Sequence, residues 1–326
     1  MSQNIDIGGK VYFIEEDPLQ LTLADSFSKN KIGTGHGEAK LYIGNENDNL
    51  KRFFNSYSPR CFFKKSDLER FLHNTECEFI NPQQEYLQKA MLPMKYDYLR
   101  SRVSSFKEDI VYFYMYRANV TPPRVYLKSD SQIFELLREI CLPNISYLSI
   151  LKLNSKDSTS LLYFNIFSDF NMGLVDYQPP NIVIANQRIK GDNQLEETEK
   201  EALHLARVGQ GVFRKKVIND CVMCPFTKIT DPRILIASHI KPWADSTHSE
   251  RLNPKNGLLL SPTFDILFDK GFITFTDDKK VYVSPWLSHE VYRSLSIYND
   301  KLLPDLPLDN ARKNFLKYHR DFIFKK

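Results

Sequence analysis

Residues 235–243 read LIASHIKPW, and residues 256–275 read NGLLLSPTFDILFDKGFITF. The first stretch predicts an apolar strand that ends at His239. An Asn-Gly pair then opens a second apolar run, and Pro262 marks the start of a short helix. We therefore expect a strand, a loop, a second strand and a helix that together form one small unit.

Three side chains of this unit suit one kind of chemistry. His239 has a near-neutral pKa and can take a proton from water. Asp265 and Asp269 are four positions apart, so they share one face of the predicted helix and can point at one ion. Taken singly, each has an ordinary explanation as a structural histidine or a solvated acid, but in this order they suit metal-assisted phosphodiester hydrolysis.

The composition is that of a globular protein with more than one domain. The chain has 326 residues, and 42% of them are hydrophobic, which is enough for two or three packed cores. A net charge of +4 decides nothing about nucleic acid, but residues 207–255 contain many lysines and arginines with few acids between them. This segment is either an ordinary solvated surface or a cationic field that attracts phosphates.

Cysteine content and hydropathy favour an intracellular setting. The five cysteines are few and odd in number, the first ten residues are polar, and no apolar run is long enough to cross a membrane. We therefore expect a cytoplasmic protein with reduced thiols and no membrane partner.

The part of the chain before residue 190 mixes strand and helix patterns. Strands are predicted near residues 11–14, 39–44, 61–63, 109–120, 147–153 and 160–167, and helices near residues 50–57, 66–74, 81–103 and 131–142. A polar stretch at residues 185–199 predicts the domain boundary. We thus expect an α+β protein with a mixed domain at 1–190, a second domain at 195–290 and a helical tail at 291–326.

The segments ASHIKPW, NGLLL and DILFDKG resemble the HNH nuclease family, and ARVGQGVFRKKVINDCVMC upstream is similar to its restriction-type branch. The resemblance spans residues 195–275 and implies a ββα-metal finger in the C-terminal domain. It implies that His239 is the general base and that Asn256 is the central asparagine, which braces the loop or lies near the metal. Asp265 and Asp269 stand where several relatives have metal-binding histidines, and Ser238 stands where many have an aspartate or histidine.

The resemblance, with this change of ligands, implies a particular cofactor. Carboxylates suit Mg²⁺ and Mn²⁺, whereas imidazole suits zinc and nickel. We therefore predict a Mg²⁺ or Mn²⁺ enzyme. Cys221 and Cys224 form one CxxC pair, and a structural zinc needs four ligands, so we expect buried thiols in a β-hairpin and no structural zinc.

Basic residues flank the predicted base. Lys241 is expected either to touch a phosphate or to lie in a turn, and Trp243 is expected to pack on the helix. Arg207 and Arg214 share one predicted helix face, where they either contact the DNA backbone or brace the finger. In the first domain Tyr112, Tyr114 and Tyr116 alternate along a strand and are expected to lie in the core or on the sheet surface, with base stacking as the alternative.

These predictions combine into a metal-dependent DNA endonuclease, which the resemblance makes a restriction enzyme. Its partner is double-stranded DNA, read by the domain at 1–190 either as a sequence or as a modified base. A homodimer would produce double-strand breaks, because one HNH site cuts one strand at a time. The alternatives are a non-catalytic DNA-binding protein with a decayed finger, a mobile-element nuclease and a nuclease toxin.

Overall fold

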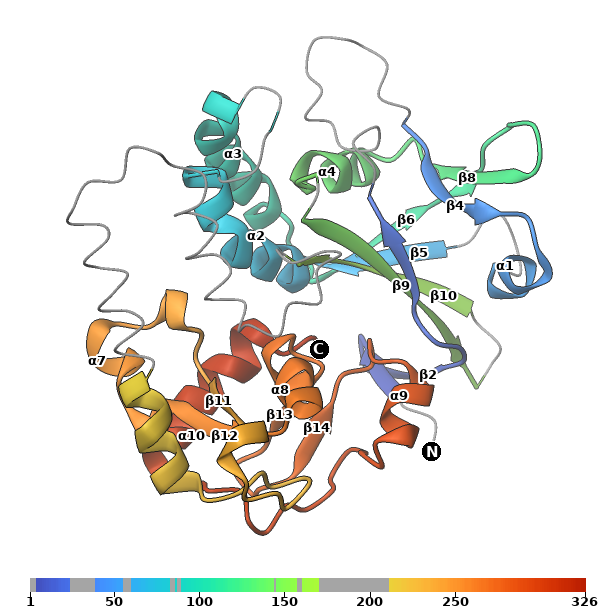
Figure 1. Ribbon diagram of the computed structural model, residues 1–326. Coiled ribbons are helices and arrows are strands. Elements are labelled where there is room, and N and C mark those ends of the chain that lie inside the picture. Colours follow the sequence, from blue (N-terminus) through green and yellow to red (C-terminus); the bar gives the residue numbers. More distant parts are fainter. Residues whose placement is uncertain are drawn as a thin grey trace. The chain divides into compact units, whose positions relative to one another are not determined.

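The computed structural model describes residues 4–23, 39–54, 60–82, 86, 89–143, 145–156, 160–169 and 211–326. The chain divides into two compact units, residues 1–175 and residues 176–326 (Figure 1). The boundary predicted at residues 185–199 lies outside the described residues.

The N-terminal unit is built on a mixed sheet in the order β1-β2-β9-β10-β5-β6, with β3 also paired to β9. Its strands are β1 (Asn4–Ile7), β2 (Lys10–Ile14), β3 (Leu19–Thr22), β5 (Arg60–Lys64), β6 (Ile110–Tyr114), β9 (Ser146–Ser155) and β10 (Ser160–Ser168). β10 runs parallel to β5, and the other pairings are antiparallel. Both faces of β9 and β10 are buried, as expected for central strands. The sequence of β10 is mostly apolar, whereas β9 also buries polar side chains such as Ser149 and Lys152.

Helices and a second sheet complete this unit. The helices are α1 (Asp48–Phe53), α2 (Lys65–Ile80), η1 (Lys89–Met91), α3 (Leu92–Ser104) and α4 (Gln132–Ile140). α2 packs against both α3 and β10. β4 (Leu41–Asn45), β8 (Arg124–Lys128) and β7 (Tyr116–Arg117) form a three-stranded sheet in that order.

The strand predicted at residues 109–120 is two strands. β6 ends at Tyr114 in the large sheet, and β7 begins at Tyr116 in the small one. Met115 between them is fully buried. The alternation of residue types continues across the break, so the sequence pattern alone gave no sign of it.

The C-terminal unit contains short elements around its own core. Its strands are β11 (Ile236–His239), β12 (Gly257–Leu260), β13 (Ile273–Phe275) and β14 (Val281–Val283). Its α-helices are a segment at 211–221, α7 (His248–Arg251), α8 (Pro262–Asp269), α9 (His289–Ser294) and α10 (Asn310–Tyr318). Its remaining helical turns are η2 (Pro232–Ile234), η3 (Trp243–Asp245), η4 (Pro254–Asn256) and the π-helical η5 (His319–Ile323).

The C-terminal residues belong to the core of this unit. Leu303, Leu306 and Leu316 pack in the same apolar cluster as the side chains of β12 and α8. Gly271 shows how closely the chain end approaches α8: it has a φ of +71°, and a Cβ there would lie 2.1 Å from the carbonyl oxygen of Ile323. Residues 291–326 are therefore part of the packing that supports α8.

The cysteine pair lies elsewhere than predicted. Cys221 ends the helical segment 211–221, and Cys224 follows in a loop, so the expected β-hairpin location is wrong. Both thiols are buried, as expected. Phe213 and Val217 hold the helical segment 211–221 to the core of the unit through their buried side chains.

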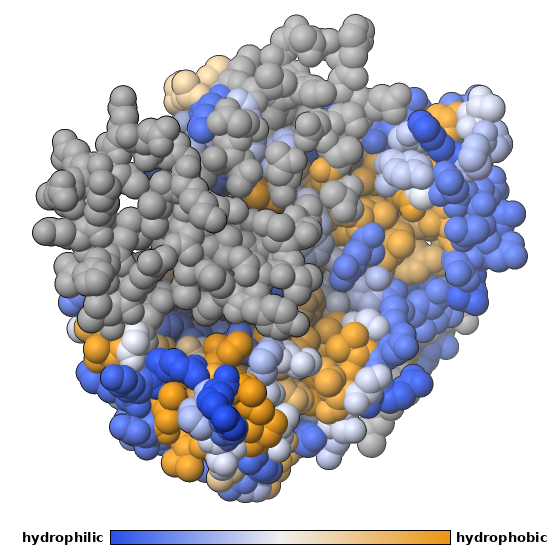
Figure 2. Space-filling model, in the orientation of Figure 1, coloured by the Kyte–Doolittle hydropathy of each residue, from blue (hydrophilic) through white to orange (hydrophobic). Residues whose placement is uncertain are grey.

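The surface does not by itself mark a site. On the visible face, hydrophobic residues lie in patches between hydrophilic ones (Figure 2). Single exposed apolar side chains, such as Met94, are common on globular proteins. Among the described residues, no helix has the length and apolar character needed to span a membrane.

Candidate active site

The β11–β12 hairpin and α8 form the frame of the predicted finger. β11 pairs antiparallel with β12, so that Ser238 lies opposite Leu258 and His239 lies opposite Gly257. α8 packs against β11. Because successive side chains of a strand point to opposite faces, Ser238 and His239 enter two different environments.

Ser238 and Asp265 meet between β11 and α8. The Ser238 hydroxyl donates a hydrogen bond to the Asp265 carboxylate, and the two residues are only 5% and 8% exposed. Burial raises the pKa of Asp265 to about 6, and the hydrogen bond offsets only part of that effect. No described lysine, arginine or histidine forms an ion pair with Asp265. A buried carboxylate without a counter-ion is unfavourable when ionised, and a bound cation would relieve this.

These two side chains fit a hard divalent cation. A carboxylate and a hydroxyl are oxygen donors, and Mg²⁺ is commonly held by one or two carboxylates while water and substrate phosphate complete its coordination. Asp269 ends α8 one turn after Asp265 and is half-buried. Within the described part of the chain, no three His, Cys, Asp or Glu side chains are grouped to hold a metal. The residues present therefore fit an ion that keeps most of its ligands from water and substrate.

His239 is held on the other side of β11 in a defined orientation. Its ring stacks on Phe213, with centroids 3.7 Å apart and planes 10° apart, and its Nε2 lies 3.1 Å from the carbonyl oxygen of Arg251. A carbonyl only accepts, so Nε2 carries the proton and Nδ1 of the neutral ring has its lone pair available. Burial lowers the pKa of His239 to about 4, so the ring is neutral at physiological pH. His239 is therefore held in the form that accepts a proton.

His319 shows what a purely structural histidine looks like in the same unit. It also stacks on a phenylalanine, Phe268, and its Nε2 also lies against a backbone carbonyl, at 2.9 Å. Its Nδ1, however, is bonded to the Thr274 hydroxyl at 3.0 Å, and the residue is 1% exposed. For Nδ1 of the half-buried His239, no partner exists among the described residues. The two rings therefore differ at Nδ1, which has a hydrogen-bond partner in His319 and is available to accept a proton in His239.

Asn256 braces the loop that follows His239. It is fully buried, its Oδ1 accepts from the backbone N–H of Lys241 at 2.8 Å, and its Nδ2 donates to the carbonyls of Lys241 and Glu250 at 3.2 and 3.3 Å. Nδ2 also lies 3.2 Å from the Ser246 hydroxyl. Since Glu250 directly precedes Arg251, Asn256 fixes the backbone that supplies the carbonyl partner of His239.

Two of the three predicted DNA-contacting residues, Lys241 and Arg214, are engaged with the protein itself. Lys241 pairs with Glu250 at 2.8 Å and lies over the ring of Tyr318. Arg214 donates to the carbonyl of Leu235 at 2.7 Å and to that of Pro232, and so holds the segment that leads into β11. Arg207 lies outside the described residues.

Arg251 is a candidate that the sequence reasoning missed. Its guanidinium lies 3.8 Å from the centroid of the Trp243 ring, and its Nε donates to the Trp243 carbonyl at 2.9 Å. It forms no ion pair with a carboxylate of the described residues. Trp243 and Arg251 meet only because the loop folds back, and no local pattern links them.

The comparisons with known proteins agree with this geometry. A family model described as HNH endonuclease matches residues 224–276, the part of the chain that contains β11, β12 and α8. A search of curated proteins gave no match. The C-terminal unit of this chain therefore contains an HNH endonuclease-family domain.

Proposed function

We propose that the protein is a metal-dependent DNA endonuclease of a restriction system, with His239 as its general base. The observation that carries this proposal is the state of His239: a neutral ring, fixed by a backbone carbonyl at Nε2, with Nδ1 left to accept a proton. HNH proteins are a nuclease family, and restriction is the narrower role that the restriction-type lead-in sequence supports.

His239, Arg251 and Asn256 have different roles in the proposed reaction. Nδ1 of His239 takes a proton from the attacking water, whose oxygen forms the new bond to phosphorus while the bond to the leaving oxygen of the sugar breaks. The Arg251 carbonyl keeps the ring in the required tautomer and disperses the positive charge that forms on it. Asn256 holds that carbonyl in place and is a positioning residue.

Asp265 and Ser238 would hold the divalent cation, with Asp269 proposed as a second carboxylate. When bound, Mg²⁺ or Mn²⁺ neutralises charge that develops on the phosphate and on the leaving oxygen. Ser238 and His239 are consecutive residues of β11. One strand therefore positions both the proposed cation ligand Ser238 and the proposed base His239.

Arg251 is the cation best placed to contact a phosphate beside the base. Its carbonyl accepts the hydrogen bond from Nε2 of His239, and among the described residues no carboxylate forms an ion pair with its guanidinium. Arginine offers several donors in one plane and binds phosphate well. Lys241, Arg207 and Arg214 remain proposed contacts with the DNA backbone.

The N-terminal unit is proposed to recognise the DNA. Tyr112 and Tyr114 lie on β6 and are 39% and 63% exposed. The guanidinium of Arg60, on the neighbouring strand β5, lies 4.1 Å from the centroid of the Tyr112 ring. Exposed aromatic rings beside cations suit stacking on unpaired bases and contact with phosphates. A dimer of the chain would place two HNH sites on the two strands of one target.

A non-catalytic DNA-binding protein is the alternative. It is favoured by the small number of metal-binding side chains, since within the described part of the chain no group of three forms. It predicts DNA binding with no cleavage in any divalent metal.

Plasmid cleavage tests the proposal. The purified full chain is incubated with methylated and unmethylated plasmid in Mg²⁺ or Mn²⁺, beside the His239→Ala variant and a control, His248→Ala, which changes an exposed histidine in α7. We expect cleavage by the wild type and by the control, and none by His239→Ala. Equal cleavage by His239→Ala would remove this base from the mechanism, and binding without any cleavage would support the alternative. Sequencing of the cut ends from methylated and unmethylated genomes then tests the restriction role.

A further inference from the structure

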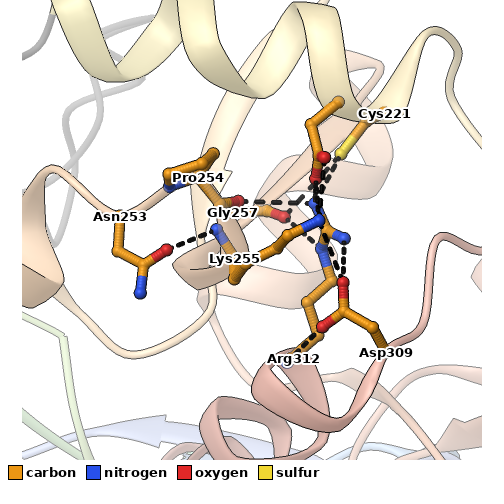
Figure 3. A network of polar contacts seen from close by, with 8 residues as sticks. Cys221, Asn253, Pro254, Lys255, Gly257, Asp309 and Arg312 are labelled. Atoms are coloured by element: carbon orange, nitrogen blue, oxygen red, sulfur yellow. Dashed lines mark hydrogen bonds and ion pairs between the residues drawn. The ribbon is translucent and has the colours of Figure 1, made fainter.

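Arg312 is a buried cation outside the segment that the HNH family model matches. It lies in α10, and the residue is only 2% exposed. Figure 3 shows its guanidinium at the centre of a network that joins three separate parts of the C-terminal unit. Such a residue either simply stabilises the unit or fixes something that the reaction needs.

Arg312 contacts two backbone carbonyls of the turn that contains Asn256. Its Nε donates to the carbonyl of Gly257 at 3.1 Å, and its Nη2 lies 3.4 Å from the carbonyl of Pro254. These two carbonyls flank Asn256, and Gly257 is the backbone partner of His239 in the hairpin. Arg312 thus holds the backbone on both sides of the residue that braces the loop.

A second arm of the network reaches the ring that stacks on the base. Nη2 of Arg312 pairs with Asp220, which lies in the helical segment 211–221. The same segment carries Phe213, whose ring stacks on His239. A Cβ on Gly257 would lie 2.8 Å from Phe213 and 2.5 Å from Val217, so the helix and the turn already touch at this point.

The charges of the network are balanced internally. Lys255 pairs with Asp220 at 2.8 Å and with Asp309 at 3.0 Å, and Arg312 pairs with both acids. Burial tends to raise the pKa of Asp220, but hydrogen bonds from Lys255 and Arg312 hold it below its usual value. Two cations and two carboxylates satisfy one another, so the network joins elements of the chain and does not need a bound ligand to balance its charge.

We propose that Arg312 is a positioning residue for the nuclease reaction, an inference that rests on the proposed function. It fixes the Asn256 turn and the helix behind His239 relative to each other, and so aligns the base without touching substrate. On this proposal the functional unit extends beyond the residues that the family model matches, to the helical segment 211–221 and to α10.

The test compares Arg312→Lys with a matched control, Arg320→Lys. Arg320 also donates to a backbone carbonyl, that of Phe275 at 2.8 Å, and also pairs with an acid, Asp277, but it contacts β13 and no part of the site. Lysine keeps the charge and cannot reproduce the planar set of donors. For each variant of the full chain, three properties are measured: kcat and KM for DNA cleavage, the NMR chemical shifts of the His239 ring protons, which report the stacking of this ring on Phe213, and the thermal midpoint.

We expect Arg312→Lys to lower kcat by about 10- to 100-fold with little change in KM, because small misplacements of a base reduce the rate and not the binding. The ring-proton shifts of His239 should move, since a displaced helix 211–221 changes the stacking of Phe213 on this ring. Arg320→Lys should leave kcat and the His239 ring-proton shifts unchanged. A lower thermal midpoint in Arg312→Lys with wild-type kcat and wild-type His239 ring-proton shifts would overturn the proposal and make Arg312 a structural residue.

Two further measurements keep the test decisive. If the wild type cuts no DNA, the proposed function fails, and the His239 ring-proton shifts alone then decide whether Arg312 aligns the ring. If Arg312→Lys does not fold, Asp309→Asn replaces it, because the Asp309 side chain is 41% exposed and this substitution weakens only one arm of the network. Asp309→Asn should lower kcat and move the His239 ring-proton shifts in the same direction by a smaller amount, and unchanged shifts would contradict the alignment role.

Discussion

Ser238 on β11 donates a hydrogen bond to Asp265 on α8, and the two side chains are buried together without a cation among the described residues. Burial of an uncompensated carboxylate explains why the pKa of Asp265 rises to about 6. A group of this kind is unfavourable for folding when ionised and becomes favourable when an ion binds. This pair therefore links stability, pH and metal in ways that can be measured.

Asp265→Asn should stabilise the metal-free protein at pH 8. The folded pKa of Asp265 lies above its unfolded value, so the folded state binds the proton more tightly, and stability is lost as pH rises from about 4 to 6. Above pH 6 the wild type carries this full cost, which a shift of about two units sets at roughly 1–3 kcal/mol. Thermal unfolding at pH 8 should show a higher midpoint for Asp265→Asn, and the difference should shrink towards pH 4.

The thermal midpoint of Asp265→Asn should not change when a divalent metal is added. Mg²⁺ or Mn²⁺ should raise the midpoint of the wild type and of the control Asp278→Asn, an exposed acid, and leave Asp265→Asn unaffected. Asp269→Asn shows whether the second carboxylate contributes. A metal response in Asp265→Asn equal to that of the wild type would remove Asp265 from the ligand set.

The acid side of the cleavage profile should report Asp265 and not His239. With a pKa of about 4, His239 stays a competent base down to about pH 5, whereas Asp265 must lose its proton near pH 6 to hold a cation. Because the cation competes with that proton, a higher Mg²⁺ concentration should move the acid limb to lower pH. Cleavage rates from pH 4.5 to 8 at two Mg²⁺ concentrations test this. An acid limb near pH 6.5 that ignores the Mg²⁺ concentration would indicate an ordinary, solvated histidine instead.

Asn256→Ala should lower both stability and kcat. It removes hydrogen bonds to Lys241, Ser246 and Glu250 at a fully buried position and leaves backbone groups unpaired, which costs about 2–4 kcal/mol in total. The loop that ends at the Arg251 carbonyl then loses its brace. Chemical denaturation measures the first effect and single-turnover cleavage the second. Ser246→Ala is the control, since it removes one of these contacts and should change kcat little.

The sequence predicted the finger well because its signals are local. The apolar runs, Pro262 and the polar loop all act within a few residues, and β11, β12 and α8 lie where these signals placed them. The mixed α+β character of the N-terminal unit followed from the same kind of pattern. Asp265 and His239 were singled out by order and spacing along the chain.

What the sequence could not predict depends on contacts between distant residues. Arg312 and Asp220 are 92 positions apart, and nothing in either neighbourhood indicates the other. The contrast between His239 and His319 also required the fold, since it depends on which carbonyl and which hydroxyl meet each ring nitrogen. The break at Met115 was missed because a buried residue between two sheets continues the alternation of a single strand.

Arg251 and Lys241 can be separated by the salt dependence of DNA binding. Each phosphate contact that is lost should reduce the slope of log Kd against log salt by about 0.9. Arg251→Gln should show this change, because its guanidinium has no carboxylate partner among the described residues. Lys241→Gln should show a smaller one, because Glu250 already balances its charge at 2.8 Å. Both are measured in the His239→Ala background, so that binding is followed without cleavage. A full change in slope for Lys241→Gln and none for Arg251→Gln would mean that DNA displaces Glu250 and that Lys241, not Arg251, holds the phosphate beside the base.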